Sequence, residues 1–388
     1  MRDEAIGIIS ARLSDAEHSR SCPLVLYDPM AGTAPLLSLA ERRGYVAFFN
    51  DLNPLHLFVN AAKTFPSYLT FRDIGPSRLL SIARRITSRL DRCARTVTDE
   101  WIERPVLDGL KHAWEMSEKE NESIVTLMRA ILLLSVRDLS SFIITKNPMW
   151  IKPGGLRPKI STEQTLRSAI ERLDIFYKWA YDDQSEVKGG RIVLTDYDAS
   201  QSTIERKVDV VITSPPLCNR IDWGRIYAPE LFFLNSVGFW HNKVEFCGTM
   251  AVRGYSEFDS EIKFVTGRSE YLGQFMKEVQ KRQRGIEKSY YTKYFTRYFA
   301  TLFRIFDMAA SALKEKNAGI YFIVRDCRYR GLTVRIGQAL VESLSIHRIY
   351  VRHLRCWVRK DLGLKNISRH DRKETLKQAE SIWHAVNR

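Results

Sequence analysis

Short hydrophobic runs alternate with segments of helical periodicity in the first part of this chain. Residues 24–27 and 45–49 are apolar enough for buried strands, and the segment 35–43 between them carries apolar residues at helical spacing. Residues 2–19 also have the pattern of a helix. Strand, turn, helix and strand in this order predict a βαβ unit, the building block of a parallel sheet covered by helices.

Longer helical patterns replace this alternation between residues 64 and 190. They include the stretches 76–95, 124–144 and 162–181. The segment 146–155 between the last two is a loop by its proline and glycine content. We therefore expect three parts, namely a first α/β part at 1–63, a helical insertion at 64–190 that could recognise the target, and the rest of the α/β domain at 191–388.

The α/β pattern resumes after the insertion. Strands are expected at 191–198, 208–212, 319–324, 347–352 and 381–386, and helices at 228–237, 294–314 and 334–344. The segment 241–293 is polar and becomes basic toward its end. The whole pattern predicts an α/β fold interrupted by helices.

The composition of the chain indicates a class of partner. The 388 residues carry a formal charge of +15, from 60 Lys and Arg against 45 Asp and Glu, which favours a polyanion such as nucleic acid. The alternative is a basic protein without such a partner, because net charge does not locate the charge. The six cysteines form no CxxC pair, which argues against a zinc site and against disulfides and fits a reducing cytosol. No signal peptide or membrane span is recognisable, so we expect a cytoplasmic protein without membrane contact.

Two turns at the ends of predicted strands are the candidates for chemistry. Thr213-Ser214-Pro215-Pro216 ends the run 208–212, and the segment 28–34, with the sequence Asp-Pro-Met-Ala-Gly-Thr-Ala, ends the first run. A glycine at position 32 lets backbone N–H groups approach a ligand closely, and the following helix N-terminus favours an anionic group.

In their order along the chain these motifs resemble the DNA amino-methyltransferases, which modify cytosine N4 or adenine N6 with S-adenosylmethionine. The resemblance covers residues 22–63 and 190–350 and implies a Rossmann-like class I methyltransferase fold with a mostly parallel seven-stranded sheet. It also implies a cofactor site for S-adenosylmethionine made of Asp28, Pro29, Met30, Gly32, Asp51, Leu52, Asp198 and Ala199. The alternative for Asp51 and Asp198 is a role as turn formers at strand ends.

The resemblance places catalysis at Ser214, Pro215, Pro216 and Leu217. In the family, the first side chain and the following proline carbonyl accept both hydrogens of the target amine, so positioning supplies the acceleration and no metal is needed. Serine in this motif favours cytosine N4 over adenine N6. An ordinary Pro-Pro turn is the structural alternative.

The chain departs from the family pattern at three positions of these motifs. Met30 replaces the usual phenylalanine, and Ala34 replaces a glycine, which keeps a close approach only if φ is negative there. Leu217 stands where the family has an aromatic residue that stacks on the flipped base. Trp223 is the candidate for a replacement ring, with a core tryptophan as the alternative.

The expected partner is double-stranded DNA with one base flipped out, held through phosphate contacts. The predicted nucleic-acid contacts are Trp223, Arg220, Lys281, Arg282, Arg284, Lys288, Arg328 and Arg330. A solvated basic face is the alternative for them.

The family implies a restriction-modification or defence setting, in which a restriction or defence subunit is a candidate partner. Two other functions stay open. One is an RNA or tRNA base amino-methyltransferase, and the other is a catalytically inactive nucleic-acid-binding subunit with the same fold.

Overall fold

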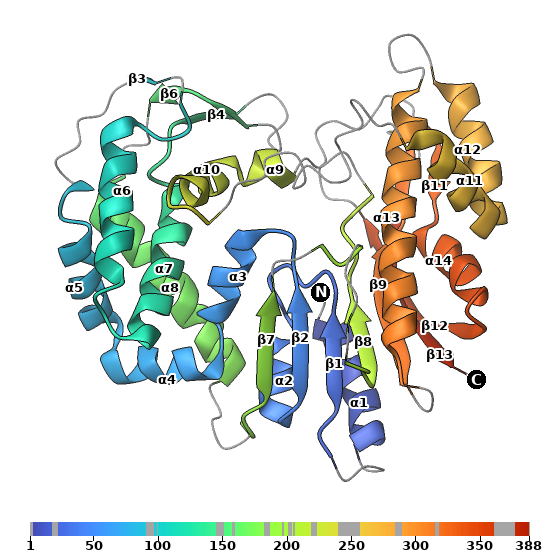
Figure 1. The fold of residues 1–388 in the computed structure, drawn as a ribbon, viewed down its shortest axis with the longest axis horizontal. Coiled ribbons are helices and arrows are strands. Elements are labelled where there is room, and N and C mark those ends of the chain that lie inside the picture. Colours follow the sequence, from blue (N-terminus) through green and yellow to red (C-terminus); the bar gives the residue numbers. More distant parts are fainter. Residues whose placement is uncertain are drawn as a thin grey trace.

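In a computed structural model of the chain, seven strands form one sheet in the order β12-β13-β9-β8-β1-β2-β7 (Figure 1). The strands are β1 (Val25–Asp28), β2 (Val46–Asn50), β7 (Arg191–Thr195), β8 (Val210–Thr213), β9 (Gly319–Arg325), β12 (Ile349–Lys360) and β13 (Lys377–Asn387). Neighbours are parallel except for β13, which runs antiparallel to both β9 and β12. The predicted α/β class with a mostly parallel seven-stranded sheet is confirmed.

The structure describes residues 3–17, 22–90, 97–98, 100–144, 151–156, 160–181, 187–195, 198–200, 204, 206–218, 223–239, 257–283, 289–314, 318–360 and 377–387. Its helices before residue 190 are α1 (Asp3–Glu17), α2 (Leu37–Arg43), α3 (Pro54–Ala61), α4 (Phe65–Ile74), α5 (Pro76–Ile86), α6 (Arg104–Ser117), α7 (Glu122–Val136) and α8 (Thr162–Tyr181). The later helices are α9 (Trp223–Ile226), α10 (Ala228–Ser236), α11 (Phe258–Arg268), α12 (Glu270–Arg282), α13 (Tyr290–Ala312) and α14 (Ile336–Ser345).

The central strands are buried on both faces. Leu26 points into a core that it shares with α1 and α2, while its neighbours Val25 and Tyr27 point into a core that contains Phe299 and Phe303 of α13. Successive side chains of a strand point to opposite faces, so a strand covered on both sides must be apolar throughout. This is why β1 and β8 are continuous hydrophobic runs in the sequence.

Helices α4 to α8, here called the helical lobe, form a separate core beside the edge strand β7 (Figure 1). This core is not limited to the predicted insertion at 64–190. It also contains Leu55 and Val59 of α3 and Phe233 and Leu234 of α10. The lobe therefore packs directly on α3 and α10, which belong to the two segments of the α/β domain on either side of the predicted insertion.

One long helical pattern of the lobe is divided in the structure. The stretch predicted as a helix at 124–144 ends as α7 at Val136, and Phe142–Ile144 forms strand β4, which pairs with β5 (Ile151–Pro153). Isoleucine has a higher strand than helix propensity. A second small pair is formed by β3 (Val97–Thr98) and β6 (Gly155–Leu156).

A hairpin that the sequence did not predict follows β9. Strands β10 (Cys327–Tyr329) and β11 (Leu332–Val334) are joined by a two-residue turn in which Arg330 has a φ of 47° and Gly331 a φ of 80°. Positive φ at both positions is the geometry of a type I′ hairpin turn. Tyr329 is buried, and its ring centroid lies 4.3 Å from that of Tyr291 in α13. The hairpin is thereby fixed to the helices that cover this end of the sheet.

Candidate methyl-transfer site

The two candidate turns leave the same edge of the sheet from neighbouring strands. Strands β1 and β8 are parallel, with Leu26 opposite Val210 and Tyr27 opposite Val211 (Figure 1). Strand β2, which ends one residue before Asp51, pairs with the other side of β1. Because parallel strands end together at one edge, this arrangement brings the loop after β1, Asp51 and Ser214 to the same edge of the sheet.

The loop after β1 is held by hydrogen bonds from β2 and α3. The N–H of Ala31 donates to the carbonyl of Asn50 over 2.8 Å, and the N–H of Gly32 donates to Oδ2 of Asp51 over 2.6 Å. The Asn60 amide donates to the Gly32 carbonyl over 2.8 Å. These hydrogen bonds fix the conformation of the loop, which favours ligand binding because less ordering is needed.

Two residues of this loop have positive φ. Gly32 has a φ of 54° and Ala34 a φ of 44°. The sequence-based condition of a negative φ at Ala34 is therefore not met. The N–H of Ala34 closes a turn to the Ala31 carbonyl over 2.8 Å, and this turn leads into α2. The left-handed conformation costs an L-residue about 1–2 kcal/mol, which explains why glycine suits this position.

Asp28 is a buried carboxyl at the end of β1. Its side chain accepts the N–H of Met30 over 3.1 Å, and it lies beside Thr213 at the end of β8. Burial raises the pKa of the Asp28 carboxyl from 3.8 to about 7, although the Met30 N–H and the Thr213 hydroxyl act in the opposite direction. The first carboxyl of the motif thus links the two candidate turns rather than facing solvent.

Asp51 is a carboxylate that several neighbouring groups contact at this edge of the sheet. Besides the Gly32 N–H, it accepts the N–H of Asn53 at Oδ1 over 2.7 Å, and the same oxygen lies 3.0 Å from Nδ1 of His56. A carboxylate has about four acceptor positions, so two backbone N–H groups and one histidine leave room for a ligand hydroxyl. The predicted Leu52 lies between Asp51 and Asn53, with a partly exposed side chain.

Helix α3 and its cap contribute polar residues to the site that the sequence motifs did not predict. Asn53 caps the helix by accepting the N–H of Leu55, and His56 and Asn60 follow on one face at a spacing of one helical turn. Asn53 Nδ2 and Asn60 Oδ1 are buried without a hydrogen-bond partner in the described protein. Buried polar atoms normally find a partner, so these two orphaned atoms fit a polar ligand at the loop. The Asn53-Pro54 pair, a helix-start signal, could have pointed to this helix.

Asp198 lies beyond β7, on the far side of β2. Its carboxylate accepts the N–H of Ser200 over 2.8 Å, the local turn that was the alternative for this residue. Ala199 next to it is buried. Both residues lie at the same edge of the sheet as Asp51, with strands β2 and β1 between them and the strand that leads to Ser214.

The Ser-Pro-Pro turn is anchored at both ends. The Ser214 hydroxyl lies 3.3 Å from the Ile323 carbonyl of β9, to which it donates. The hydroxyl of Tyr298 in α13 donates to the Pro216 carbonyl over 2.8 Å. Pro215 is buried, Pro216 is exposed and Leu217 is half-buried. The lone pairs of the Ser214 oxygen are available to accept a hydrogen, because its own hydrogen points into the sheet.

Cys218, the next residue, is a packed thiol. It is 3% exposed, and burial raises its pKa well above the ordinary value. A thiol held in its neutral form is a poor nucleophile. Cys218 is therefore a structural residue of the core that it shares with α13.

The helical lobe is bonded to the segment that follows the Ser-Pro-Pro turn. Arg137, at the end of α7, donates from Nε to Oε1 of Glu230 in α10 over 2.8 Å and from Nη2 to Oε2 over 3.0 Å. The same guanidinium donates to the Ile226 carbonyl. Glu230 is 5% exposed. Tyr227 lies between these contacts, and its ring packs edge-on against His56 with centroids 5.6 Å apart.

The predicted nucleic-acid residues do not form one described cluster. Arg282 donates to the Arg330 carbonyl and Arg330 donates to the Arg282 carbonyl, each over 2.6 Å, so both residues join α12 to the β10–β11 hairpin. Lys281 pairs with Glu278 at 2.7 Å. Arg328 lies in β10 of the same hairpin. Arg220, Arg284, Lys288 and the side chain of Trp223 fall outside the described residues.

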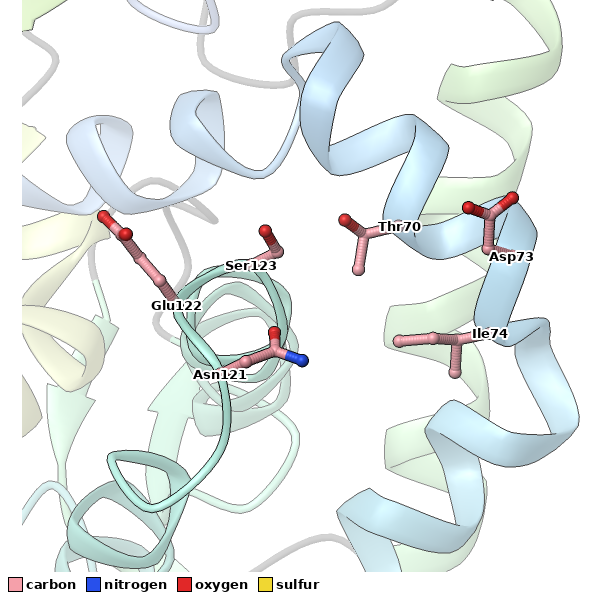
Figure 2. A pocket seen from close by; sticks show the side chains of 6 residues that line it. All are labelled: Thr70, Asp73, Ile74, Asn121, Glu122 and Ser123. Atoms are coloured by element: carbon pink, nitrogen blue, oxygen red, sulfur yellow. The ribbon is translucent and has the colours of Figure 1, made fainter.

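One hollow in the described structure lies away from these residues. Figure 2 shows it between α4 and the start of α7, with a volume of about 440 Å³. It is lined by Thr70, Asp73, Ile74, Asn121, Glu122 and Ser123. A second hollow of about 320 Å³ borders it and reaches Ile192 and Leu194 of β7. Neither is lined by a predicted site residue, so strand-end geometry is what defines the candidate site.

Comparison with known proteins adds no relative. The chain matches no family model and no curated protein. Among the described residues, no group of three or more His, Cys, Asp and Glu side chains is placed to hold a metal ion. None of the described helices has the length and apolar character that crossing a bilayer requires.

Proposed function

We propose that the chain is an S-adenosylmethionine-dependent methyltransferase of the class I fold that modifies an exocyclic amine of a DNA base, with cytosine N4 favoured over adenine N6. The observation that carries the proposal is the adjacency of the loop after β1 and the Ser-Pro-Pro turn after β8 on neighbouring parallel strands. Two motifs that are about 180 residues apart in the sequence would be unrelated if they ended at opposite edges of the sheet.

The sheet supports the class I assignment. It has seven strands, and from β7 to β9 their order follows the 3-2-1-4-5 order of doubly wound folds. In such sheets, ligands bind outside the carboxyl ends of the strands, which is where Asp28, Asp51 and Ser214 lie.

S-adenosylmethionine supplies an electrophilic methyl group on a sulfonium sulfur when it is bound. The residues that would hold it are those of the loop after β1 and of α3. Gly32 and Ala34 shape the loop, and Asp51 has an acceptor position left for a hydroxyl group. Asn53 and Asn60 offer a buried donor and a buried acceptor that lack protein partners.

Ser214 and the adjoining prolines would hold the target amine. The Ser214 oxygen accepts one hydrogen of the amine because its own hydrogen is donated toward Ile323. The Pro215 carbonyl accepts the other. This fixes the nitrogen in one orientation, and fixed orientation is a large source of rate acceleration for a direct transfer.

Two basic features support nucleic acid as the acceptor. The formal charge is +15, and the hairpin that follows β9 carries Arg328 and Arg330 next to the Ser-Pro-Pro side of the sheet. Cationic side chains at this edge of the sheet would contact phosphates and raise the affinity for nucleic acid in a salt-dependent manner.

Transfer of a radiolabelled methyl group to duplex DNA tests the proposal. Wild type, Ser214→Ala and the control Ser260→Ala would be compared, because Ser260 is an exposed serine of α11. We expect incorporation with wild type and the control, and a loss of at least about tenfold with Ser214→Ala, since one acceptor of the amine is removed.

Three other results would redirect the proposal. Equal incorporation by wild type and Ser214→Ala would exclude this site. Incorporation into tRNA but not into DNA would identify an RNA enzyme. Binding of nucleic acid without transfer to either polymer would favour an inactive binding subunit.

A further inference from the structure

The Ser-Pro-Pro turn has few means of holding its own shape. Pro215 and Pro216 lack an N–H group, so neither can donate a backbone hydrogen bond. The proline rings fix φ at both positions, and the Pro216 ring also restricts ψ of Pro215, which leaves ψ of Pro216 as the soft torsion. The direction of the Pro216 carbonyl therefore depends on contacts with neighbouring elements.

Tyr298 supplies such a contact from the far side of the core. It lies in the middle of α13, is 2% exposed, and donates its hydroxyl hydrogen to the Pro216 carbonyl over 2.8 Å. Its ring packs edge-on against Phe299 with centroids 5.2 Å apart. Burial raises the pKa of Tyr298 well above its ordinary value, so the hydroxyl stays a donor.

The first residues of the turn are fixed by the sheet. Thr213 is the last residue of β8, opposite Phe322 of β9, and Ser214 donates to the Ile323 carbonyl. Between this end and the Tyr298 contact, the φ angles of both prolines are locked by their rings. Holding the Pro216 carbonyl thus limits how far the Pro215 carbonyl can rotate.

We propose that Tyr298 is a positioning residue, which fixes the Ser-Pro-Pro turn through the Pro216 carbonyl and so aims the Ser214 oxygen and the Pro215 carbonyl at the acceptor amine. This inference rests on the proposed function for the chemistry of the amine. The anchoring of the turn itself is a physical statement that does not depend on methyl transfer.

Tyr294 provides a matched control on the same helix. It lies one turn before Tyr298 and is 1% exposed, and its hydroxyl lies beside the thiol of Cys218, a residue beyond the turn. Replacing either tyrosine by phenylalanine removes one buried hydroxyl and keeps the ring. The two variants differ in whether the lost hydrogen bond holds the turn.

The experiment compares wild type, Tyr298→Phe and Tyr294→Phe in the full chain with two independent measurements. Hydrogen exchange followed by mass spectrometry reports on the amides of Leu217 and Cys218, in a peptide that spans the turn. Steady-state methyl transfer to duplex DNA gives kcat and KM, and calorimetry gives the Kd for S-adenosylmethionine.

For Tyr298→Phe we expect about tenfold faster exchange in the peptide and about tenfold lower kcat, the effect of one hydrogen bond. We expect the Kd for S-adenosylmethionine to be unchanged. Tyr294→Phe should leave the exchange of the turn and kcat near the wild-type values.

Unchanged exchange at the turn in Tyr298→Phe would overturn the inference, as would an equal effect of Tyr294→Phe. A parallel loss of cofactor affinity would also overturn it, because it would indicate general loosening of the core. If wild type transfers no methyl group to any nucleic acid, the proposed function fails, while the exchange measurement still decides whether Tyr298 holds the turn.

Discussion

The backbone N–H of Gly32 and the carboxylate of Asp51 are joined by a hydrogen bond of 2.6 Å. This bond ties the loop after β1 to the residue that follows β2. The same carboxylate receives the N–H of Asn53 and lies 3.0 Å from His56 Nδ1. The Asp51 side chain therefore holds together the loop after β1 and the start of α3.

Replacing Asp51 by asparagine should weaken cofactor binding. An amide has a single acceptor oxygen, so its NH2 group would face either the Gly32 or the Asn53 N–H and leave that donor unpaired. We expect the Kd for S-adenosylmethionine to rise about tenfold or more, as measured by calorimetry. Asp73→Asn is the control, because the Asp73 side chain is 67% exposed in α4. Equal affinities in both variants would exclude Asp51 from the cofactor site.

Two glycines with open space around them allow a test of the loop conformation. A Cβ at Gly32 or at Gly7 would meet no atom within 4 Å, but only Gly32 has a positive φ, of 54°. Gly32→Ala should therefore destabilise the protein by about 1 kcal/mol through backbone strain. Gly7→Ala, in α1, should stabilise it by up to about 1 kcal/mol. Urea denaturation of the two variants measures both effects, and a stabilised Gly32→Ala would contradict the left-handed turn.

The ion pair between the helical lobe and α10 should matter for stability. Arg137→Met leaves Glu230, with its side chain 6% exposed, without a cation, while the Arg137 side chain itself is 33% exposed. Breaking a buried pair costs about 3–5 kcal/mol, and partial exposure reduces this, so we expect a loss of about 2–3 kcal/mol. Arg104→Met is the control. Arg104 forms an exposed pair with Asp108, and its removal should cost about 0.5 kcal/mol or less.

Thermal unfolding of both variants checks this prediction. Similar losses in Arg137→Met and Arg104→Met would mean that the contact between the lobe and α10 contributes no more than an ordinary surface pair. The predicted loss should also be smaller at acidic pH, because protonation of Glu230 removes the unpaired charge.

The Asp28 carboxyl should give the stability a characteristic pH dependence. Burial raises its pKa from 3.8 to about 7, so between these values the folded protein keeps a proton that the unfolded chain releases. The contribution of this group to stability is therefore greatest at low pH and declines as the pH rises through this range. Asp28→Asn removes the titration, at up to about 1.4 kcal/mol for each pKa unit.

The midpoint of thermal unfolding, measured from about pH 5 to about pH 8, tests this linkage. The difference in midpoint between Asp28→Asn and wild type should move in favour of the variant as the pH rises. Glu41, whose pKa burial also raises to about 7, titrates in both proteins and cancels in the difference. A difference that does not change with pH would show that Asp28 is ionised throughout.

The strands around the site could be predicted because they are buried on both faces. Residues such as Val25, Leu26 and Val211 form continuous apolar runs that periodicity detects. Positions of Ser214 and Asp51 at strand ends followed directly from these runs. The end of α7 could not be predicted from its pattern, because Ser135 and Val136, the last residues of the helix, keep the helical spacing and give no signal that the helix stops there.

The contacts that shape the site depend on pairs far apart in the sequence. Tyr298 and Pro216 are 82 residues apart, and no local pattern relates a tyrosine in an amphipathic helix to a proline carbonyl. The φ of Ala34 could not be predicted either, because the pattern gives the residue type but not the turn that the loop must make to meet Asn50 and Asp51. Such positions are set by tertiary contacts.

The shared core of the helical lobe has a consequence for engineering the protein. Phe233 and Leu234 of α10 are fully buried among residues of α4 to α8. Excising residues 64–190, or exchanging them for a lobe from another protein, would leave these two side chains against water. A chimaera with a different lobe would have to transplant α3 and α10 together with it, because the structural unit is larger than the contiguous stretch of sequence.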